Sequence, residues 1–256
     1  MQPHERISAA IAAANEGGRT ALVPFITAGY PEPAEFIATL REVAGVGDVV
    51  ELGIPFSDPM ADGMTIQRSS FEALKKGVSL QWIFEQLESA GYVGAPLVMM
   101  SYLNPLLAFG YQALAKRAAA TGVCAFIVPD LPFEESADLR AALEAEGLGL
   151  IQLVTPATPD ARLKMLSDAS RGFVYAVTIT GITGGGAGLP ADLTDYLDKV
   201  ASASDLPVCA GFGIREAKDV ANVGQHASGA IVGSALVEVL ERGDDAEAYL
   251  RSLLVQ

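Results

Sequence analysis

The sequence predicts an α/β fold, a (β/α)8 TIM barrel with an extra N-terminal helix. Eight short apolar segments rich in β-branched residues recur along the chain, and stretches with helical periodicity separate them. A spacing of roughly thirty residues suits a strand with its crossover helix, and near-continuously apolar strands suit a parallel sheet covered on both faces. A doubly wound open sheet is the alternative, but no Gly-x-Gly-x-x-Gly follows the first strand.

The predicted strands lie, in order, within Thr20–Thr27, Asp48–Gly53, Ala95–Ser101, Gly122–Val128, Gly149–Val154, Gly172–Thr178, Leu206–Gly211 and Gly229–Gly233. Between them, apolar residues return every three or four positions, as in Glu35–Gly45, Tyr111–Gly122 and Glu134–Gly147, and this spacing predicts helices. The same spacing in Glu5–Gly17 predicts the extra helix before the first strand. The long interval between the second and third strands leaves room for one more helix.

Length and composition predict a single domain, residues 1–256. Half of the residues (50%) are hydrophobic, which is enough for one large core, and no linker interrupts the series. No apolar run reaches the roughly eighteen residues of a membrane span, and no signal sequence is evident, so we expect a soluble, cytoplasmic protein. The net charge of −14 argues against nucleic-acid binding, but not against a small phosphorylated ligand. Cys124 and Cys209 lie in apolar segments and are expected to be buried thiols.

In this architecture the chemistry belongs to the loops at the C-terminal ends of the strands. Strand alternation puts Glu51 on the same face as Val49, opposite Val50 and Leu52, and one of these faces is the barrel interior. Burial would raise the pKa of this carboxyl group into the range of a general acid and base. A salt bridge to a cation on another strand is the alternative, but none of the eight segments contains Lys or Arg.

Two further acids follow Glu51 in the second loop. Asp58, between Ser57 and Pro59, is expected to be a turn or capping residue. Asp62 is a candidate for capping a helix that starts at Met64, or for reaching back over the barrel mouth as a catalytic or binding residue.

Glycine-rich loops follow the sixth, seventh and eighth strands. Residues 180–190, TGITGGGAGLP, contain five glycines and suggest a mobile lid, although a flexible connection is the alternative. The loops GFGIRE and VGSALVE occupy the places where barrels often bind phosphate through backbone N–H groups. Gly213 and Gly233 would allow close approach of an anion, and Ser234 would donate its hydroxyl while capping the next helix.

An apolar, partly aromatic ligand is predicted from side chains at or near the strand ends, namely Phe25, Met100, Tyr102, Ile127, Leu153, Tyr175 and Phe212. His4 and His226 lie near the terminus and in a helix-to-strand connection. Neither histidine catalysis nor a metal site is therefore indicated.

The motifs VPFITAGYP, ELGIPFSDPMADG, YLNP, VPDLPFEES, TGITG, GFGI and VGSALV resemble, in sequence and order, those of the tryptophan synthase α-subunit family. The resemblance covers nearly the whole chain and implies a (β/α)8 lyase. Its reaction would be the reversible retro-aldol cleavage of indole-3-glycerol phosphate to indole and glyceraldehyde 3-phosphate. It also implies that this chain has no cofactor of its own, and that its partner is a β subunit, containing pyridoxal phosphate, in an α2β2 complex.

The resemblance further implies roles for individual residues. Glu51 would protonate C3 of the indole and deprotonate the adjacent hydroxyl, while Asp62 would bind the indole N–H and stabilise positive charge on the ring. Tyr175 would assist near the reacting centre, and Thr183 would hydrogen-bond Asp62 once the lid closes. The phosphate contacts of the family correspond to Gly184, Gly213, Gly233 and Ser234.

The chain departs from the family pattern in two places. It has TITG where Ser-Arg-Thr-Gly is common before the lid, and Met64 where a proline often follows Ala-Asp-Gly. Extra glycine would make lid closure less favourable, and the lost proline would make the second loop less rigid. Two alternatives therefore remain at this point: a catalytically weak subunit that mainly activates its partner, and a sugar-phosphate isomerase on the same scaffold.

Overall fold

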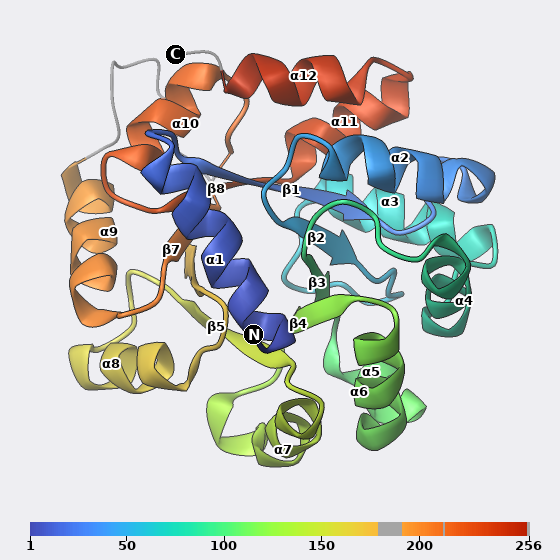
Figure 1. The fold of residues 1–256 in the computed structure, drawn as a ribbon, viewed down its shortest axis with the longest axis horizontal. Coiled ribbons are helices and arrows are strands. Elements are labelled where there is room, and N and C mark those ends of the chain that lie inside the picture. The colour runs from blue at the N-terminus through green and yellow to red at the C-terminus, as the bar shows by residue number, and fades with distance from the viewer. Residues whose placement is uncertain (179–190, 212, 255–256) are drawn as a thin grey trace.

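Eight parallel strands close into a barrel in a computed structural model that describes residues 1–178, 191–211 and 213–254 (Figure 1). Each strand pairs with its neighbours in the chain, and β8 pairs with β1, which excludes the open doubly wound sheet. The strands are β1 Ala21–Thr27, β2 Val50–Gly53, β3 Leu97–Met100, β4 Val123–Ile127, β5 Gly149–Val154, β6 Val174–Val177, β7 Val208–Gly211 and β8 Gly229–Val232. Each one lies within its predicted segment, so the predicted fold class is confirmed.

Helices surround the barrel and connect its strands (Figure 1). They are α1 Pro3–Glu16, α2 Phe36–Ala44, α3 Met64–Lys75, α4 Leu80–Ala90, α5 Leu103–Phe109, α6 Tyr111–Ala120, α7 Ala137–Ala145, α8 Asp160–Ala169, α9 Ala191–Ala203, α10 Ala217–Gly224, α11 Ser234–Arg242 and α12 Ala246–Leu253. The extra N-terminal helix and the further helix between β2 and β3 are both present.

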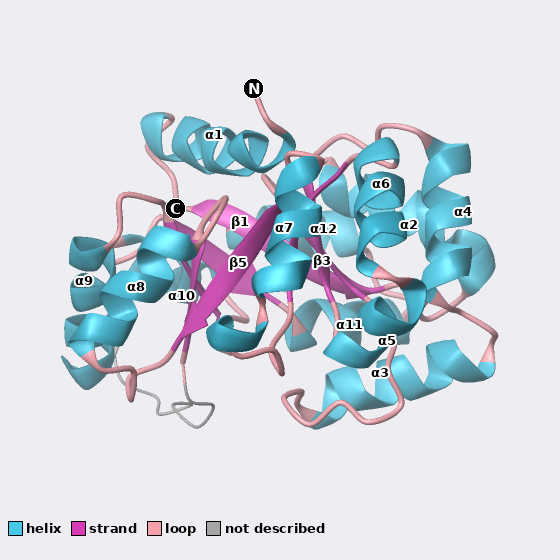
Figure 2. Cartoon of the chain, turned by 90° about the horizontal axis from the view of Figure 1, so that it is seen from below, coloured by secondary structure: helices cyan, strands magenta, loops and turns pink. Residues whose placement is uncertain are grey.

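Alternation along the strands creates two apolar layers. Val49 and Val98 belong to the cluster inside the barrel, whereas Val50 and Leu52 pack in the layer between the sheet and the helices. The interior cluster includes Ile7 and Ile11 of α1, which are fully buried. Figure 2 shows α1 at one end of the barrel and α3 at the other. Helix α1 therefore covers the N-terminal ends of the strands and leaves the opposite end for a site.

The segment SYLNP follows β3, where the (β/α)8 pattern places a loop, but most of it is helical. Helix α5 begins at Leu103, so that Asn104 and Pro105 lie in its first turn. Proline is tolerated there because the first N–H groups of a helix have no partner within the helix. The proline in this motif therefore marks the start of a short helix.

The two cysteines and the membrane prediction agree with the structure. Cys124 and Cys209 are free and buried, as predicted. Over the described parts of the chain, no helix has the length and apolar character needed to cross a membrane.

Met64→Pro is expected to stabilise the fold by about 0.4–1 kcal/mol. Met64 is the first residue of α3, its side chain is 77% exposed, and the preceding Gly63 is extended at φ −72° and ψ 164°. Proline suits this position because the N–H there needs no helical partner and the residue before proline is required to be extended. Urea unfolding followed by circular dichroism measures the gain. Met64→Ala is the matched control, since it removes the side chain without fixing φ; a Met64→Pro variant no more stable than this control would contradict the expectation.

Candidate active site

A cavity of about 260 Å³ opens at the C-terminal ends of the barrel strands. It brings together most of the predicted site residues: the described side chains and loops around it include Phe25, Glu51, Asp62, Met100, Leu153, Tyr175, Gly213, Gly233 and Ser234. These residues come from loops and strands that are far apart in the sequence. Closure of the barrel is what places them around one space.

Glu51 lies in β2 with its side chain directed into the barrel, and only 1% of its surface is exposed. Among the described residues, its buried Oε2 atom has no hydrogen-bond partner, and the carboxylate takes part in no ion pair. Loss of hydration raises the pKa of Glu51 from 4.5 to about 8, and the negative charge of nearby Asp62 adds to the rise. At neutral pH this side chain is therefore a carboxylic acid that is ready to donate its proton.

Asp62 is held over the cavity by Tyr102. The Tyr102 hydroxyl donates to Oδ2 of Asp62 at 3.1 Å and accepts the backbone N–H of Ala61 at 2.8 Å. Phe56 stacks on the Tyr102 ring, with centroids 5.1 Å apart. Partial burial raises the pKa of Asp62, and the hydrogen bond from Tyr102 opposes that rise. Helix α3 is capped by Gly63, so Asp62 is not a capping residue and its carboxylate faces the site.

The remainder of this loop is fixed by its own hydrogen bonds. The Gln67 side chain donates to the carbonyl oxygen of Asp62 at 2.9 Å and to that of Pro59 at 3.3 Å. Asp58 is exposed, accepts a hydrogen bond from Ser57 at 2.6 Å and does not line the cavity.

Two glycines that the sequence analysis did not single out make room for the cavity wall. A Cβ atom at Gly53 would lie 2.4 Å from the Phe25 ring, and one at Gly211 would lie 2.8 Å from the Tyr175 hydroxyl. Burial, followed by the negative charge of Glu51, holds the pKa of Tyr175 well above its usual range, so this phenol is neutral. The signal for both glycines was their position at the last residue of a strand.

The loops after β7 and β8 form the candidate phosphate cradle. Gly213 has φ +41°, which disfavours any residue with a side chain, and Gly233 precedes α11. The prediction that Ser234 caps this helix is wrong: Gly233 is the N-cap, and Ser234 is the first helical residue. A side chain at this position does not reach the N–H groups that a capping residue would bind, so the hydroxyl remains available to a ligand.

Some predicted residues are not placed around the cavity. Ile127 is fully buried in the interior cluster and is not among the lining residues, and Tyr102 reaches the site through Asp62. Thr183, Gly184 and Phe212 lie outside the described residues. Conversely, Arg215 lines the cavity but was not singled out, although it directly follows GFGI in the sequence.

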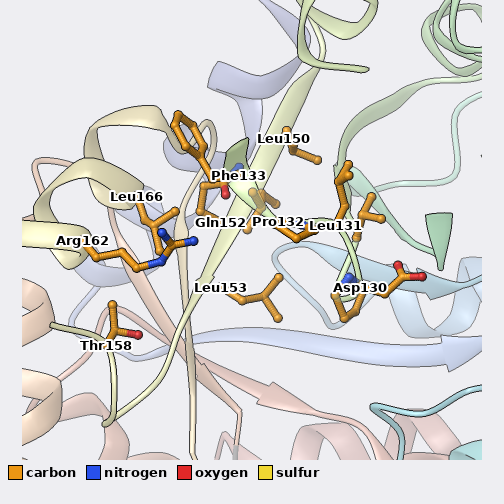
Figure 3. A pocket seen from close by; sticks show the side chains of 13 residues that line it. Asp130, Leu131, Pro132, Phe133, Leu150, Gln152, Leu153, Thr158, Arg162 and Leu166 are labelled. Carbon is orange, nitrogen blue, oxygen red and sulfur yellow. The ribbon is translucent and has the colours of Figure 1, made fainter. Parts of the chain in front are cut away.

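A second cavity, of about 340 Å³, lies beside the first one. Figure 3 shows side chains from the loop after β4, from β5 and from α8 around it. The two cavities share Pro129 and Leu153 as lining residues, but only the smaller one contains Glu51 and Asp62. The chemistry therefore belongs to the smaller cavity.

The described residues contain no group of three or more His, Cys, Asp and Glu placed to hold a metal ion. His4 contacts the carbonyl oxygen of Gly147 at 2.9 Å, and His226 pairs with Asp198 at 2.7 Å. Both histidines lie outside the residues that line the catalytic cavity.

A buried carboxylic acid and a second carboxylate at the C-terminal mouth of a closed parallel barrel are the arrangement expected of a (β/α)8-barrel enzyme. Comparison with known proteins identifies which one. The family model described as tryptophan synthase alpha chain matches residues 11–256, and the chain belongs to this family. The protein is a carbon–carbon lyase whose reaction is the cleavage of indole-3-glycerol phosphate, and the isomerase alternative is thereby excluded.

Relatives support this assignment over almost the full length. The tryptophan synthase alpha chain of Desulfovibrio desulfuricans is 44% identical over 244 residues, covering 94% of this chain and 96% of the relative. That of Roseiflexus castenholzii is 44% identical over 252 residues, covering 96% of each. Among solved structures, Mycobacterium tuberculosis tryptophan synthase superposes with a TM-score of 0.89 at 34% identity, covering 97% of this chain and 96% of that one. The alpha subunit from Legionella pneumophila gives 0.88 at 31% identity, covering 99% and 97%.

The pH dependence of stability tests the buried acid. Because the folded pKa of Glu51, about 8, exceeds the unfolded value of 4.5, the folded state retains a proton that the unfolded state has lost between these two pH values. Glu51 therefore lowers the free energy of unfolding as the pH rises from about 4.5 to 8, and the total loss is on the order of a few kcal/mol. Glu51→Gln removes this titration.

Urea unfolding of both proteins between pH 4.5 and 8.5 measures the difference. Relative to the wild type, Glu51→Gln is expected to gain stability steadily across this range and to level off above pH 8. A difference that does not change with pH would show that the carboxyl group titrates normally.

Proposed function

We propose that Glu51 is the proton donor and acceptor of the cleavage reaction and that Asp62 stabilises charge on the indole. The observation that carries this assignment is the Oε2 atom of Glu51, which is buried without a partner beside the cavity. An unpaired polar atom in the interior is costly, and such an atom is usually retained where a ligand will meet it.

The reaction requires two proton transfers at neighbouring atoms. Glu51, as a carboxylic acid, donates a proton to C3 of the indole, and the resulting carboxylate then accepts the proton of the adjacent side-chain hydroxyl. As that proton leaves, the carbon–carbon bond breaks, the hydroxyl carbon becomes the aldehyde of glyceraldehyde 3-phosphate, and indole is released. One carboxyl group suffices, because the proton that it gives is replaced by the proton that it takes.

Asp62 supplies the electrostatic part of the mechanism. Protonation of C3 puts positive charge on the indole ring, and a carboxylate that accepts the ring N–H stabilises this charge most strongly in the transition state. Tyr102 fixes the Asp62 carboxylate. Tyr175 lines the cavity as a neutral phenol and would be able to donate a hydrogen bond near the reacting atoms. The apolar wall formed by Phe25, Met100 and Leu153 suits the bicyclic ring. The position of Phe212 near a strand end adds it to this wall, and the family resemblance adds Thr183 as a partner of Asp62 after closure.

The phosphate end of the substrate is assigned to the loops after β7 and β8. Backbone N–H groups of Gly213, Gly233 and Ser234, together with the Ser234 hydroxyl, are suited to an anion at the N-terminus of α11. Gly184 is a further phosphate contact by resemblance. The cavity thus holds an apolar ring and a charged tail at separate places.

The partner of this chain is, in the same proposal, a tryptophan synthase β subunit in an α2β2 complex. Pyridoxal phosphate belongs to that subunit, and the α chain has no cofactor of its own. We also propose that residues 1–256 form one domain, since β8 closes on β1 and α1 packs into the interior, and that the protein acts in the cytoplasm.

Glu51→Gln is expected to abolish measurable indole release from indole-3-glycerol phosphate, a loss of at least about 10²–10⁴-fold in kcat. Shape and volume are preserved, so the variant should still bind indole-3-propanol phosphate, a non-cleavable analogue, with nearly wild-type affinity. Asp58→Asn, which neutralises an exposed carboxylate of the same loop, is the matched control and should keep its activity. Wild-type turnover by Glu51→Gln would refute the assignment, and assay of the isolated wild-type chain measures how much activity it has without a partner.

Ser234→Ala is expected to raise KM by about tenfold while changing kcat little, because one hydrogen bond to a charged phosphate is lost in both ground and transition states. Steady-state kinetics of indole release separates the two constants. Ser252→Ala, at an exposed position of α12, is the control. A fall in kcat without a change in KM would place Ser234 at the reacting atoms instead.

A further inference from the structure

Arg215 lies at the edge of the phosphate cradle without an assigned role. It follows Gly213 and Ile214 in the loop after β7 and lines the catalytic cavity together with Gly233 and Ser234. Among the described residues around this cavity it is the one cationic side chain. A phosphate bound by backbone N–H groups alone would meet no full positive charge there.

The backbone of Arg215 is held by two hydrogen bonds, whereas its side chain is half exposed. Its N–H donates to Asp219 at 2.9 Å, and its carbonyl oxygen accepts the Tyr249 hydroxyl at 3.3 Å. Its side chain is 52% exposed, so the guanidinium group is able to move without opening the core.

The present partner of the guanidinium group is the Glu238 carboxylate. Nη1 of Arg215 donates to Oε2 at 2.8 Å, and Nη2 donates to Oε1 at 3.1 Å. Glu238 follows Ser234 by four residues on α11, and therefore lies one turn beyond the cradle on the same side of the helix. The hydrogen bonds from Arg215 keep the pKa of Glu238 below its usual value, so the carboxylate is ionised. A two-pronged contact of this kind suits a phosphate as well as a carboxylate.

We propose that the substrate phosphate replaces Glu238 as the partner of Arg215. This proposal rests on the proposed function, because it needs a phosphate in the cradle. The phosphate dianion carries more negative charge than the carboxylate. It would bind near the two N–H donors of the Arg215 guanidinium group, which already lie beside α11. The cation also offsets the repulsion that the Asp62 carboxylate, and a chain with net charge −14, exert on the incoming dianion.

The exchange connects the cradle to the loop that carries Asp62. Oε1 of Glu238 also accepts the Thr65 hydroxyl at 3.3 Å, and Thr65 is the second residue of α3. Arg215 and Thr65 therefore share one carboxylate oxygen. When Arg215 turns to the phosphate, Glu238 becomes fully available to Thr65, three residues after Asp62.

Removing the positive charge of Arg215 and the negative charge of Glu238 in separate variants tests the proposal. Arg215→Gln is expected to weaken the binding of indole-3-propanol phosphate by about three- to tenfold, because a charged contact is lost. Glu238→Gln is expected to tighten it by about two- to fivefold, because the competitor for Arg215 is removed. The double variant should resemble Arg215→Gln, and Arg215→Lys, which keeps the charge without the fork, should lie between wild type and Arg215→Gln. Isothermal titration calorimetry of the full chain measures each affinity.

Indole-3-propanol, which lacks the phosphate, is the matched ligand, and its affinity should be unchanged in every variant. If Arg215→Gln and Glu238→Gln weaken phosphate-ester binding alike, or if the alcohol is affected as much as the ester, the pair is only structural and the proposal fails. Failure of the proposed function gives a different result, since the wild type would then bind the ester no better than the alcohol. Melting temperatures identify any variant that does not fold, and the lysine variant then decides the question.

Discussion

The burial of the Glu51 carboxyl group without a counter-ion is the constraint on which this site depends. A charged group in that position would lose its hydration and gain no cation in return, so the interior holds the group in its neutral form. The surrounding strands tolerate the cost because they are otherwise apolar and tightly packed. Because the carboxylic acid has no partner in the protein, its proton is available to a ligand. The burial of Glu51 thus lowers the stability of the fold and provides a reactive group.

The second acid is controlled in a different way. Asp62 comes from a loop outside the sheet, so its position depends on contacts with another βα unit, above all the hydroxyl of Tyr102. That hydroxyl acts as donor to the carboxylate and as acceptor from the preceding backbone, and it therefore fixes both the loop and the side chain. Two carboxyl groups close in sequence thus acquire different environments: one is neutral and buried, whereas the other is hydrogen-bonded and partly exposed. In the proposed mechanism, this separation would allow Glu51 to transfer protons while Asp62 stabilises charge.

Most of the fold was predictable from the sequence, because strand and helix periodicity are local properties and barrel closure follows from eight repeats of one unit. The inward direction of Glu51 was predictable for the same reason, since strand alternation fixes it. Contacts between units were not predictable: Tyr102 with Asp62, and Arg215 with Glu238, join residues from different loops and helices. The need for glycine at positions 53 and 211 was also not predictable. It arises because the Phe25 and Tyr175 side chains, from other strands, lie where a Cβ atom would be. The helix start at Ser234 was misjudged by one residue, which changes a capping hydroxyl into one available to a ligand.

The position of helix α1 determines at which end of the barrel substrate and products enter and leave. Its buried isoleucines fill the N-terminal end of the interior, and the catalytic cavity opens at the C-terminal ends of the strands. Substrate and products are therefore expected to enter and leave at the C-terminal end. Glyceraldehyde 3-phosphate and indole would leave past the same rim but from different parts of it. A protein that captures indole before it reaches bulk water therefore has to dock at the C-terminal end of the barrel.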